Sequence, residues 1–440
     1  MQTVEPVRAF RYRPEVVGDL AGVVAPPYDV ITPRQQQELH ERHPDNVIRL
    51  DLALQLPTDD DTRNRYTRSR EELLRLLRQG SIAQDAAPAF YVYDQTFLLP
   101  DGRTVTRRGV IGRRRIEDDD SGIRAHERTL EGPKEDRFRL FRATHVACSQ
   151  VFTFYTDPER QVETLLETPG VLEPLARFTT PDGVVHTLGR VTSPEAIARI
   201  SEVLSGVVHY IADGHHRFET FRNYRRTRLA ETSQVTGQEP WQFASVFMAN
   251  TAQEGLVILP IHRLVHGLTD CSWPSLWASL QQECTIQAVE GDAQAAWKAL
   301  QKVQGQGPAF AWKCRDASWQ IVRPTPEAHQ AFCRTSGLPR PVAELDVSWL
   351  HEKVFRERLG ITREAQAAQT HLDYCHSPAE VEEALRDHPE YQAAVMLNPV
   401  QVSQIEAVAA AGERMPQKST FFYPKILTGV VIHPLEEEIP

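Results

Sequence analysis

A chain of 440 residues that is 41% hydrophobic and 25% charged has the composition of a globular protein with two or three domains, which excludes a disordered or fibrous chain. Its 49 basic and 59 acidic residues give a net charge of −10, so we expect no broad surface for coating nucleic acid or a membrane. The N-terminal residues lack a signal-peptide pattern and no uncharged apolar stretch is long enough to span a bilayer, so we expect a cytoplasmic protein without membrane or nucleic-acid partners.

The first part of the chain predicts a helix that begins after Thr32 and Pro33, because threonine is a good helix cap and proline is accepted at the first helical position. A second helix is predicted over about 61–79, followed by a hairpin with strands near 89–98 and 104–116. The second strand of the hairpin is rich in arginine and leads into acidic residues. We expect a solvated strand face beside a neutralising loop. The arginines are Arg107, Arg108, Arg113, Arg114 and Arg115.

Residues 210–219 read Tyr-Ile-Ala-Asp-Gly-His-His-Arg-Phe-Glu and contain the densest group of titratable side chains at a predicted element boundary. The apolar run 207–212 predicts a strand, Asp213 and Gly214 predict a turn and helix cap, and the apolar residues that follow predict a helix. A helix start offers backbone N–H groups and a positive dipole end, which suit phosphate. An ordinary cap with surface histidines is the alternative, but a plain cap needs only one polar residue.

Charged residues also gather at His126 and Glu127 and over 132–137, ahead of an apolar strand predicted over 146–155. A solvated helix start would explain part of this group. The C-terminal part alternates predicted helices and strands, and a boundary is expected near Pro260. We therefore predict an N-terminal part over 1–260 and a C-terminal part over 261–440, with the latter contributing to the same cleft if the segment around Lys425 returns to the N-terminal sheet.

Four motifs in this order resemble domain-of-unknown-function family 1015, and the resemblance covers nearly the whole chain. The Asp-Gly-His-His-Arg element of the third motif is also similar to that of free-serine kinases built on the ParB/sulfiredoxin fold. The four motifs are the segment 25–31, His126-Glu127 with 132–137, the segment 212–217, and the segment 415–425.

The resemblance implies a mixed α/β fold with a ParB/sulfiredoxin-like nucleotide-binding core, large insertions and a C-terminal α/β part. It implies a phosphotransferase that makes O-phosphoserine from free serine, with ATP or ADP and Mg²⁺ as cofactors and a hydroxyl amino acid as substrate. A serine hydroxyl must lose its proton during attack, and a carboxylate is the usual acceptor, while cations neutralise the transferring group.

The resemblance also implies residue roles. Catalytic roles fall to Asp213, His215 and His216, with Asp29 or Glu127 as the candidate proton acceptor. Phosphate-binding roles fall to Gly214, Arg217, Lys134, Arg137 and Lys418, and a metal-orienting role falls to Asp136.

Two other functions are considered. The first is a ParB-like nucleotide-binding and nucleotide-hydrolysing regulatory protein, for which the acidic charge and the lack of a recognisable helix-turn-helix make DNA a poor partner. The second is a metal-dependent hydrolase that uses His126, His215 and His216. Adjacent histidines cannot easily ligate one ion from a regular helix, so this function ranks last.

Overall fold

The structure is a computed structural model that describes residues 3–99, 101–119, 122–127, 131–269 and 271–438, with the backbone alone described over 131–134. The chain divides into two compact units. Unit 1 comprises Met1–Ala125, Thr129–Val257 and Pro424–Pro440, and unit 2 comprises Ile258–Tyr423 together with the short segment around His126 and Glu127. Residues from Pro424 onward belong to unit 1, where the backbone of Pro424 and Lys425 accepts hydrogen bonds from strands of its sheet.

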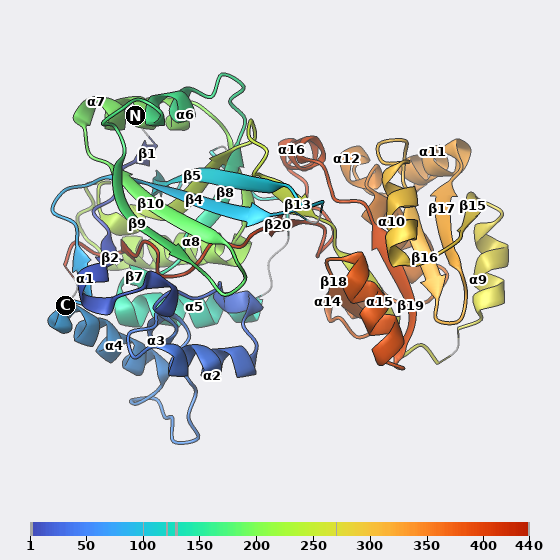
Figure 1. Ribbon diagram of the computed structural model, residues 1–440, viewed down its shortest axis with the longest axis horizontal. Helices are drawn as coiled ribbons and strands as arrows, with labels where there is room; N and C mark the ends of the chain where they lie inside the picture. Colours follow the sequence, from blue (N-terminus) through green and yellow to red (C-terminus); the bar gives the residue numbers. More distant parts are fainter. Residues whose placement is uncertain (1–2, 100, 120–121, 128–130, 270, 439–440) are drawn as a thin grey trace. The chain divides into compact units, whose positions relative to one another are not determined.

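Unit 1 is built on a mixed sheet of nine strands within the described residues, in the order β6-β11-β8-β12-β5-β4-β10-β9, with β1 added to β5 (Figure 1). The β6–β11 and β8–β12 pairs are parallel and the other pairs are antiparallel. The strands are β1 (Val4–Glu5), β4 (Phe90–Leu98), β5 (Thr104–Arg115), β6 (Ile123–Arg124), β8 (Val151–Tyr155), β9 (Glu173–Thr179), β10 (Val185–Val191), β11 (His209–Asp213) and β12 (Phe243–Asn250). Two small ribbons pair β2 (Phe10–Tyr12) with β3 (Ile82–Gln84) and β7 (Val146–Ala147) with β21 (His433–Pro434).

The helices predicted after Thr32 and over about 61–79 are present in unit 1 as α2 and α4. Thr32 caps α2 with a reciprocal capping box, and the predicted hairpin is confirmed as β4 and β5. In Figure 1, α8 lies beside α5 in unit 1, and the two helices pack on each other. The helices are α1 (Pro14–Val17), α2 (Pro33–Arg42), α3 (Ile48–Asp51), α4 (Arg65–Gln79), α5 (Glu131–Thr144), α6 (Gln161–Leu166), α7 (Pro194–Ser205) and α8 (His215–Glu231), with short 3-10 turns η1 (Leu20–Gly22), η2 (Tyr28–Val30) and η3 (Pro240–Gln242).

The two faces of the unit 1 sheet have different neighbours because side chains alternate along each strand. One face carries Val92, Val110 and Val246, which pack in an apolar core with residues of α5, α7 and α8. The other face carries Gln95 and Arg107, which bind the backbone of the C-terminal segment. Arg107 Nη2 donates to the carbonyl of Pro424 at 2.5 Å, and Gln95 donates to the carbonyl of Lys425 at 2.9 Å.

The expectation of a solvated arginine face on β5 is wrong. Arg107 is fully buried, where its guanidinium also hydrogen bonds to Gln95 and lies over the rings of Phe152 and Phe247. Arg114 is buried as well. Burial lowers the pKa of Arg107 to about 9. Strand periodicity could not show this, because the carbonyl that accepts from Arg107 comes from a segment 317 residues further along the chain.

Gly109 on β5 provides a test of packing on this buried face. A Cβ atom at residue 109 would lie 2.2 Å from Cζ of Phe247, whose side chain is fully buried. We expect Gly109→Ala to lower the free energy of unfolding by about 1–3 kcal/mol through overpacking, measured by chemical denaturation. The same change in a Phe247→Leu background should cost clearly less, and an equal cost in both backgrounds would contradict the assigned contact.

Unit 2 is a second mixed α/β unit with an antiparallel sheet in the order β15-β17-β16-β19-β14-β18. The strands are β14 (His262–His266), β15 (Cys284–Val289), β16 (Phe310–Cys314), β17 (Trp319–Pro324), β18 (Leu372–Cys375) and β19 (Tyr391–Leu397), and β13 (Val257–Leu259) pairs with β20 (Phe421–Tyr423). The helices are α9 (Trp273–Leu280), α10 (Ala293–Gln301), α11 (Pro326–Thr335), α12 (Arg340–Ala343), α13 (Asp346–Trp349), α14 (Arg363–Ala367), α15 (Pro378–Asp387) and α16 (Val402–Ala410), with a π-helical segment, η4 (Leu350–Arg356), directly after α13.

The predicted mixed α/β class is thus confirmed. None of the helices within the described ranges is both long and apolar enough to cross a bilayer.

Candidate functional site

The segment that the sequence selects as a candidate site is the junction where β11 ends at Asp213 and α8 begins at His215. Gly214 is the N-cap residue of α8 and has a left-handed backbone with φ of 89°. A Cβ atom there would also lie 2.9 Å from Nε of Arg217. Both features require glycine at residue 214. Asp213 does not cap the helix as predicted, because it is the last residue of the strand and its side chain binds elsewhere.

The carboxylate of Asp213 is held between two cations. Lys425 Nζ donates to Oδ1 of Asp213 at 2.5 Å, and Arg217 Nη2 donates to Oδ2 at 2.5 Å. The side chains of Asp213 and Lys425 are 15% and 18% exposed, whereas that of Arg217 is only 4% exposed. Lys425 is therefore the cation of this group that reaches solvent from the helix start.

The two cations control the ionisation of Asp213. Burial alone would raise its pKa, but the charges of Lys425 and Arg217 and the hydrogen bond from Lys425 outweigh burial and hold the pKa well below its usual range. Asp213 is therefore ionised throughout the neutral pH range. A carboxylate with so low a pKa is a poor proton acceptor. Asp213 lies between Lys425 and Arg217, and this arrangement suits a residue that fixes the positions of these two cations.

Arg217 is less accessible than the sequence suggested. Its guanidinium donates to the backbone carbonyl of Gln150 as well as to Asp213. The phosphate-binding role predicted for Arg217 would require these bonds to be broken. As it stands, Arg217 links the Asp213 carboxylate to the buried backbone that precedes β8.

Arg137 is also buried, and its guanidinium joins the first motif to the second. It donates to the carbonyl of Asp51 at 2.8 Å, pairs with the carboxylates of Asp51 and Asp136, and lies 4.3 Å from the centre of the Tyr28 ring. Asp136 is bound by Arg65 and the Tyr66 hydroxyl in addition to Arg137. Its oxygens are thus occupied by two cations and a phenol and do not fit the metal-orienting role expected of Asp136.

Asp51 belongs to this network, although the sequence analysis did not select it. Burial raises its pKa, and the charges of Arg137 and Arg217 oppose that increase. Arg137 and Arg217 also act on the pKa of Tyr28, which burial raises to about 12. The sequence signal that could have identified Asp51 is a lone carboxylate within the apolar run 47–53.

The remaining predicted residues of unit 1 are His215, His216, Asp29 and Lys134. His215 is buried, and its charge contributes to the low pKa of Asp213. His216 is half-buried, and its carbonyl accepts a hydrogen bond from Thr220 at 2.8 Å. Asp29 is exposed in η2, directly after Tyr28, and its charge acts on Asp51. Lys134 is in α5, but its side chain lies outside the described residues.

Glu127, His126 and Lys418 belong to unit 2. The Lys418 backbone N–H donates to Oε1 of Glu127 at 3.3 Å, and His126 Nε2 lies 3.1 Å from the Thr420 hydroxyl. Lys418 is exposed and has a positive φ of 56°. The start of the second motif and the centre of the fourth therefore lie side by side in unit 2.

The described residues contain no group of three or more His, Cys, Asp or Glu side chains arranged to hold a metal ion. His215 and His216 occupy consecutive positions at the start of α8, and His126 is assigned to unit 2. The structure therefore offers no observation that favours the metal-dependent hydrolase.

The chain is thus a mixed α/β protein with a group of charged side chains between a sheet strand and a helix start. The chain belongs to the family described as Protein of unknown function (DUF1015), whose profile matches residues 4–348. The family resemblance expected from the four motifs is thus confirmed.

Solved structures that match the chain include a conserved hypothetical protein from Pyrococcus furiosus, with 12% identity, a TM-score of 0.31, and coverage of 69% of this chain and 89% of that one. They also include a mutant free serine kinase in complex with AMP, with 10% identity, a TM-score of 0.35, and coverage of 69% and 86%. The complex of that kinase type with ADP has 10% identity, a TM-score of 0.34, and coverage of 70% and 94%. No curated protein matches the chain. At these identities and TM-scores the likeness carries no argument about activity.

Proposed function

We propose that this protein is a nucleotide-dependent phosphotransferase that phosphorylates a small hydroxyl compound, with free serine as the acceptor. The observation that carries the proposal is the carboxylate of Asp213 held between Lys425 and Arg217 at the start of α8. A fixed ammonium group beside a helix N-terminus is suited to an anion, because both carry positive charge.

Phosphoryl transfer depends mainly on positioning and on neutralising the charge of the transferring group. Lys425 is suited to bind a phosphate oxygen because Asp213 fixes its ammonium group and because its side chain is not fully buried. Arg217 and Arg137 act behind this position. Their buried guanidiniums hold Asp213, Asp51 and Asp136 in place and contribute positive charge to the junction.

The acceptor hydroxyl must transfer its proton to a base. Both carboxylate oxygens of Asp213 already accept hydrogen bonds from Lys425 and Arg217, so we assign it to positioning. Asp29 and Glu127 remain the candidate bases. Among the histidines, His216 at the first turn of α8 is half-buried and is assigned to contact with the phosphate donor or the acceptor.

The resemblance of the Asp-Gly-His-His-Arg element at 213–217 to that of free-serine kinases makes serine and an adenine nucleotide the first pair to test. The donor would be ATP or ADP in its magnesium-bound form, in which the metal neutralises phosphate charge. The donor set around Asp136 does not fit magnesium, and no step is assigned to that residue.

The test is a phosphoryl-transfer assay of the full chain with Mg²⁺, ATP or ADP, and each hydroxyl amino acid in turn, with the product identified by mass spectrometry. We expect O-phosphoserine from serine and no product with alanine. His216→Ala should reduce the rate at least tenfold if its ring contacts the reacting groups. The matched control is His388→Ala, which removes an exposed histidine of unit 2 and should leave the rate unchanged.

Absence of any phosphorylated product under these conditions would overturn the kinase proposal. If the protein nevertheless binds the nucleotide, the result favours the regulatory nucleotide-binding function. Equal rates for His216→Ala and the wild type would leave the activity in place but remove His216 from the site.

A further inference from the structure

The segment that carries Lys425 is held to the sheet of unit 1 through its backbone. The carbonyl of Pro424 accepts a hydrogen bond from Arg107 Nη2 at 2.5 Å, and the carbonyl of Lys425 accepts one from Gln95 Nε2 at 2.9 Å. Two consecutive carbonyls are thus bound by two side chains of one β-hairpin. Proline at residue 424 also restricts the chain directly before Lys425, because its ring fixes φ.

Gln95 and Arg107 act together on this hairpin. They are direct cross-strand partners in β4 and β5, and Nη2 of Arg107 donates to Oε1 of Gln95. Because the amide oxygen of Gln95 faces the guanidinium, its nitrogen is directed to the carbonyl of Lys425. Both side chains are fully buried. We refer to these two residues as the Gln95–Arg107 pair.

The surroundings of the Gln95–Arg107 pair fix it in place. The guanidinium lies 4.6 Å from the centre of the Phe152 ring and 5.7 Å from that of Phe247. A further anchor follows later in the C-terminal segment, where Thr428 exchanges two backbone hydrogen bonds with Ala25, at 2.8 and 3.2 Å. The segment is therefore fixed on both sides of its lysine.

The position of this backbone decides where the ammonium group of Lys425 can lie. Its Nζ donates to Oδ1 of Asp213 at 2.5 Å, and such charge-assisted bonds depend on distance and direction. The Gln95–Arg107 pair also lies within electrostatic range of this carboxylate: burial lowers the pKa of Arg107, and the charges of Tyr93 and Asp213 oppose that decrease. A misplacement of about 1 Å at a reacting group can lower a rate by about 10²-fold.

We propose that Gln95 and Arg107 are positioning residues for Lys425, which hold its ammonium group at Asp213 in the place where it would bind a phosphate oxygen. They act through the backbone of residues 424 and 425 and have no contact with the reacting groups. The consequence for catalysis rests on the proposed phosphotransferase function. The effect on the ammonium group of Lys425 does not depend on any activity.

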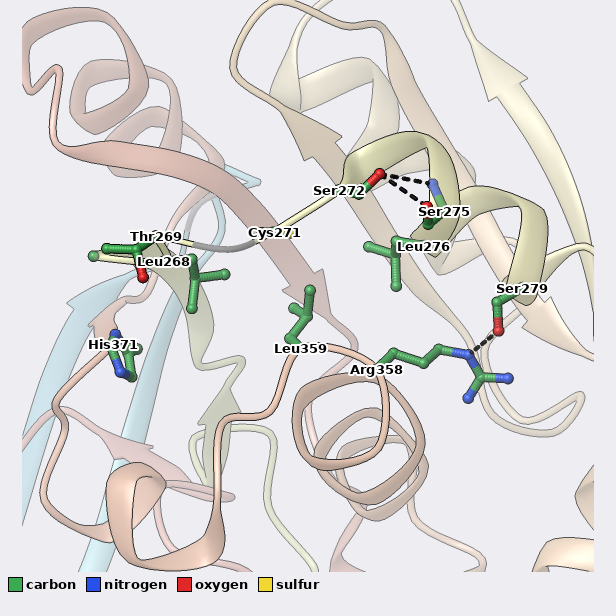
Figure 2. A pocket seen from close by; sticks show the side chains of 11 residues that line it. Leu268, Thr269, Cys271, Ser272, Ser275, Leu276, Ser279, Arg358, Leu359 and His371 are labelled. Atoms are coloured by element: carbon green, nitrogen blue, oxygen red, sulfur yellow. Dashed lines mark hydrogen bonds between the residues drawn. The ribbon is translucent and has the colours of Figure 1, made fainter.

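Arg358 of unit 2 is a contrasting arginine, whose partners lie outside the candidate site. Figure 2 shows it at a cavity of about 500 Å³, where its Nε donates to the hydroxyl of Ser279 at 2.9 Å. It also donates to the carbonyl of Lys353 and to Glu283, each at 2.6 Å. All these partners belong to unit 2, so a change at Arg358 is a control for the loss of arginine contacts as such.

The first test measures how readily Lys425 reacts with an amine reagent, which requires no substrate. The full chain is treated briefly with acetic anhydride at pH 8, and the acetylated fraction of each lysine is determined by mass spectrometry. We expect Gln95→Met to raise the labelling rate of Lys425 at least threefold, because an ammonium group released from its ion pair loses its proton more readily. Labelling of Lys298, an exposed lysine of α10, should not change.

Gln253→Met is the matched control for this test. The amide of Gln253 also donates to two backbone carbonyls of unit 1, those of Arg108 and Asn250. Gln253→Met and Arg358→Lys should both leave the labelling of Lys425 unchanged. An equal rise in Gln253→Met overturns the proposal, because it would show a general loosening of the fold.

Arg107→Lys provides a second variant in case Gln95→Met does not fold. It keeps a buried cation but lacks the planar guanidinium that binds Gln95 and Pro424 together. Its labelling of Lys425 should rise at least twofold. Labelling of Lys425 at the wild-type rate in whichever of the two variants is folded overturns the proposal.

The second test uses the rate of O-phosphoserine formation. Gln95→Met should lower kcat about tenfold, and it should cause no further loss in a Lys425→Met background, because the residue through which it acts is then absent. Equal fold losses in both backgrounds would contradict a positioning role. An inactive wild type would overturn the proposed function alone, since the labelling of Lys425 still decides whether the Gln95–Arg107 pair positions it.

Discussion

Lys425→Met is expected to reduce the rate of phosphoryl transfer by about 10²–10³-fold, because it removes a fixed positive charge that would face the transferring group. Methionine keeps most of the length of the side chain but cannot pair with Asp213. The measurement is the rate of O-phosphoserine formation by the variant and the wild type under identical conditions. Lys425→Arg keeps the charge and should recover part of the lost rate.

Two controls separate this effect from damage to the fold. Lys298→Met removes an exposed lysine from α10 and should leave the rate unchanged. Chemical denaturation of Lys425→Met should show a loss of only about 1–2 kcal/mol in the free energy of unfolding, because Asp213 keeps its second cation, Arg217. A Lys425→Met protein that is folded and as active as the wild type would remove Lys425 from the proposed mechanism.

Asp346→Asn is expected to stabilise the protein at pH 8 much more than at pH 4. Burial raises the pKa of Asp346 to about 7, against about 3.9 for an unfolded aspartate. Between these two values the folded state keeps a proton that the unfolded state releases, so the wild type loses stability as the pH rises from 4 to 7. The difference between the two pKa values corresponds to a loss of about 2–4 kcal/mol in the free energy of unfolding, after a reduction for the partial exposure of the Asp346 side chain.

Asparagine has no such titration and can still accept the backbone hydrogen bond that Asp346 receives from Ala309. The measurement is urea denaturation at pH 4 and at pH 8, followed by the fluorescence of buried tryptophans such as Trp312 and Trp349. Asp316→Asn changes an exposed carboxylate of unit 2 and should change the free energy of unfolding by the same small amount at both pH values. An equal effect of Asp346→Asn at both pH values would show that the carboxyl group is solvated.

The parts of the fold that the sequence predicts are those determined by local patterns. The strand and helix on either side of Gly214, the capping box of Thr32 and the hairpin of β4 and β5 depend on residues within a few positions of one another. The presence of a charged group at the helix start was predicted for the same reason, since Asp213 and Arg217 are four residues apart.

The features that the sequence does not predict depend on partners far along the chain. Asp213 and Lys425 are 212 residues apart, and no period or motif spacing relates them. Arg107 has the sequence context of a solvated strand residue, but a distant carbonyl and two rings make it a buried one. Asp51 was missed because a single carboxylate in an apolar run does not reveal that two buried arginines act on it.

The return of the C-terminal segment to unit 1 has a consequence for the synthesis of the protein. Phe10 forms a bridge with Ile432 and Ala25 with Thr428, so the first segments of unit 1 acquire these neighbours only from residues that are made much later. The whole of unit 2 leaves the ribosome before Lys425 does. Until then, the sheet face that holds Arg107 and Phe247 lacks its covering segment and exposes apolar surface, which favours binding by chaperones. The Lys425–Asp213 pair can therefore form only after synthesis has passed residue 425, when the whole of unit 2 has already been made.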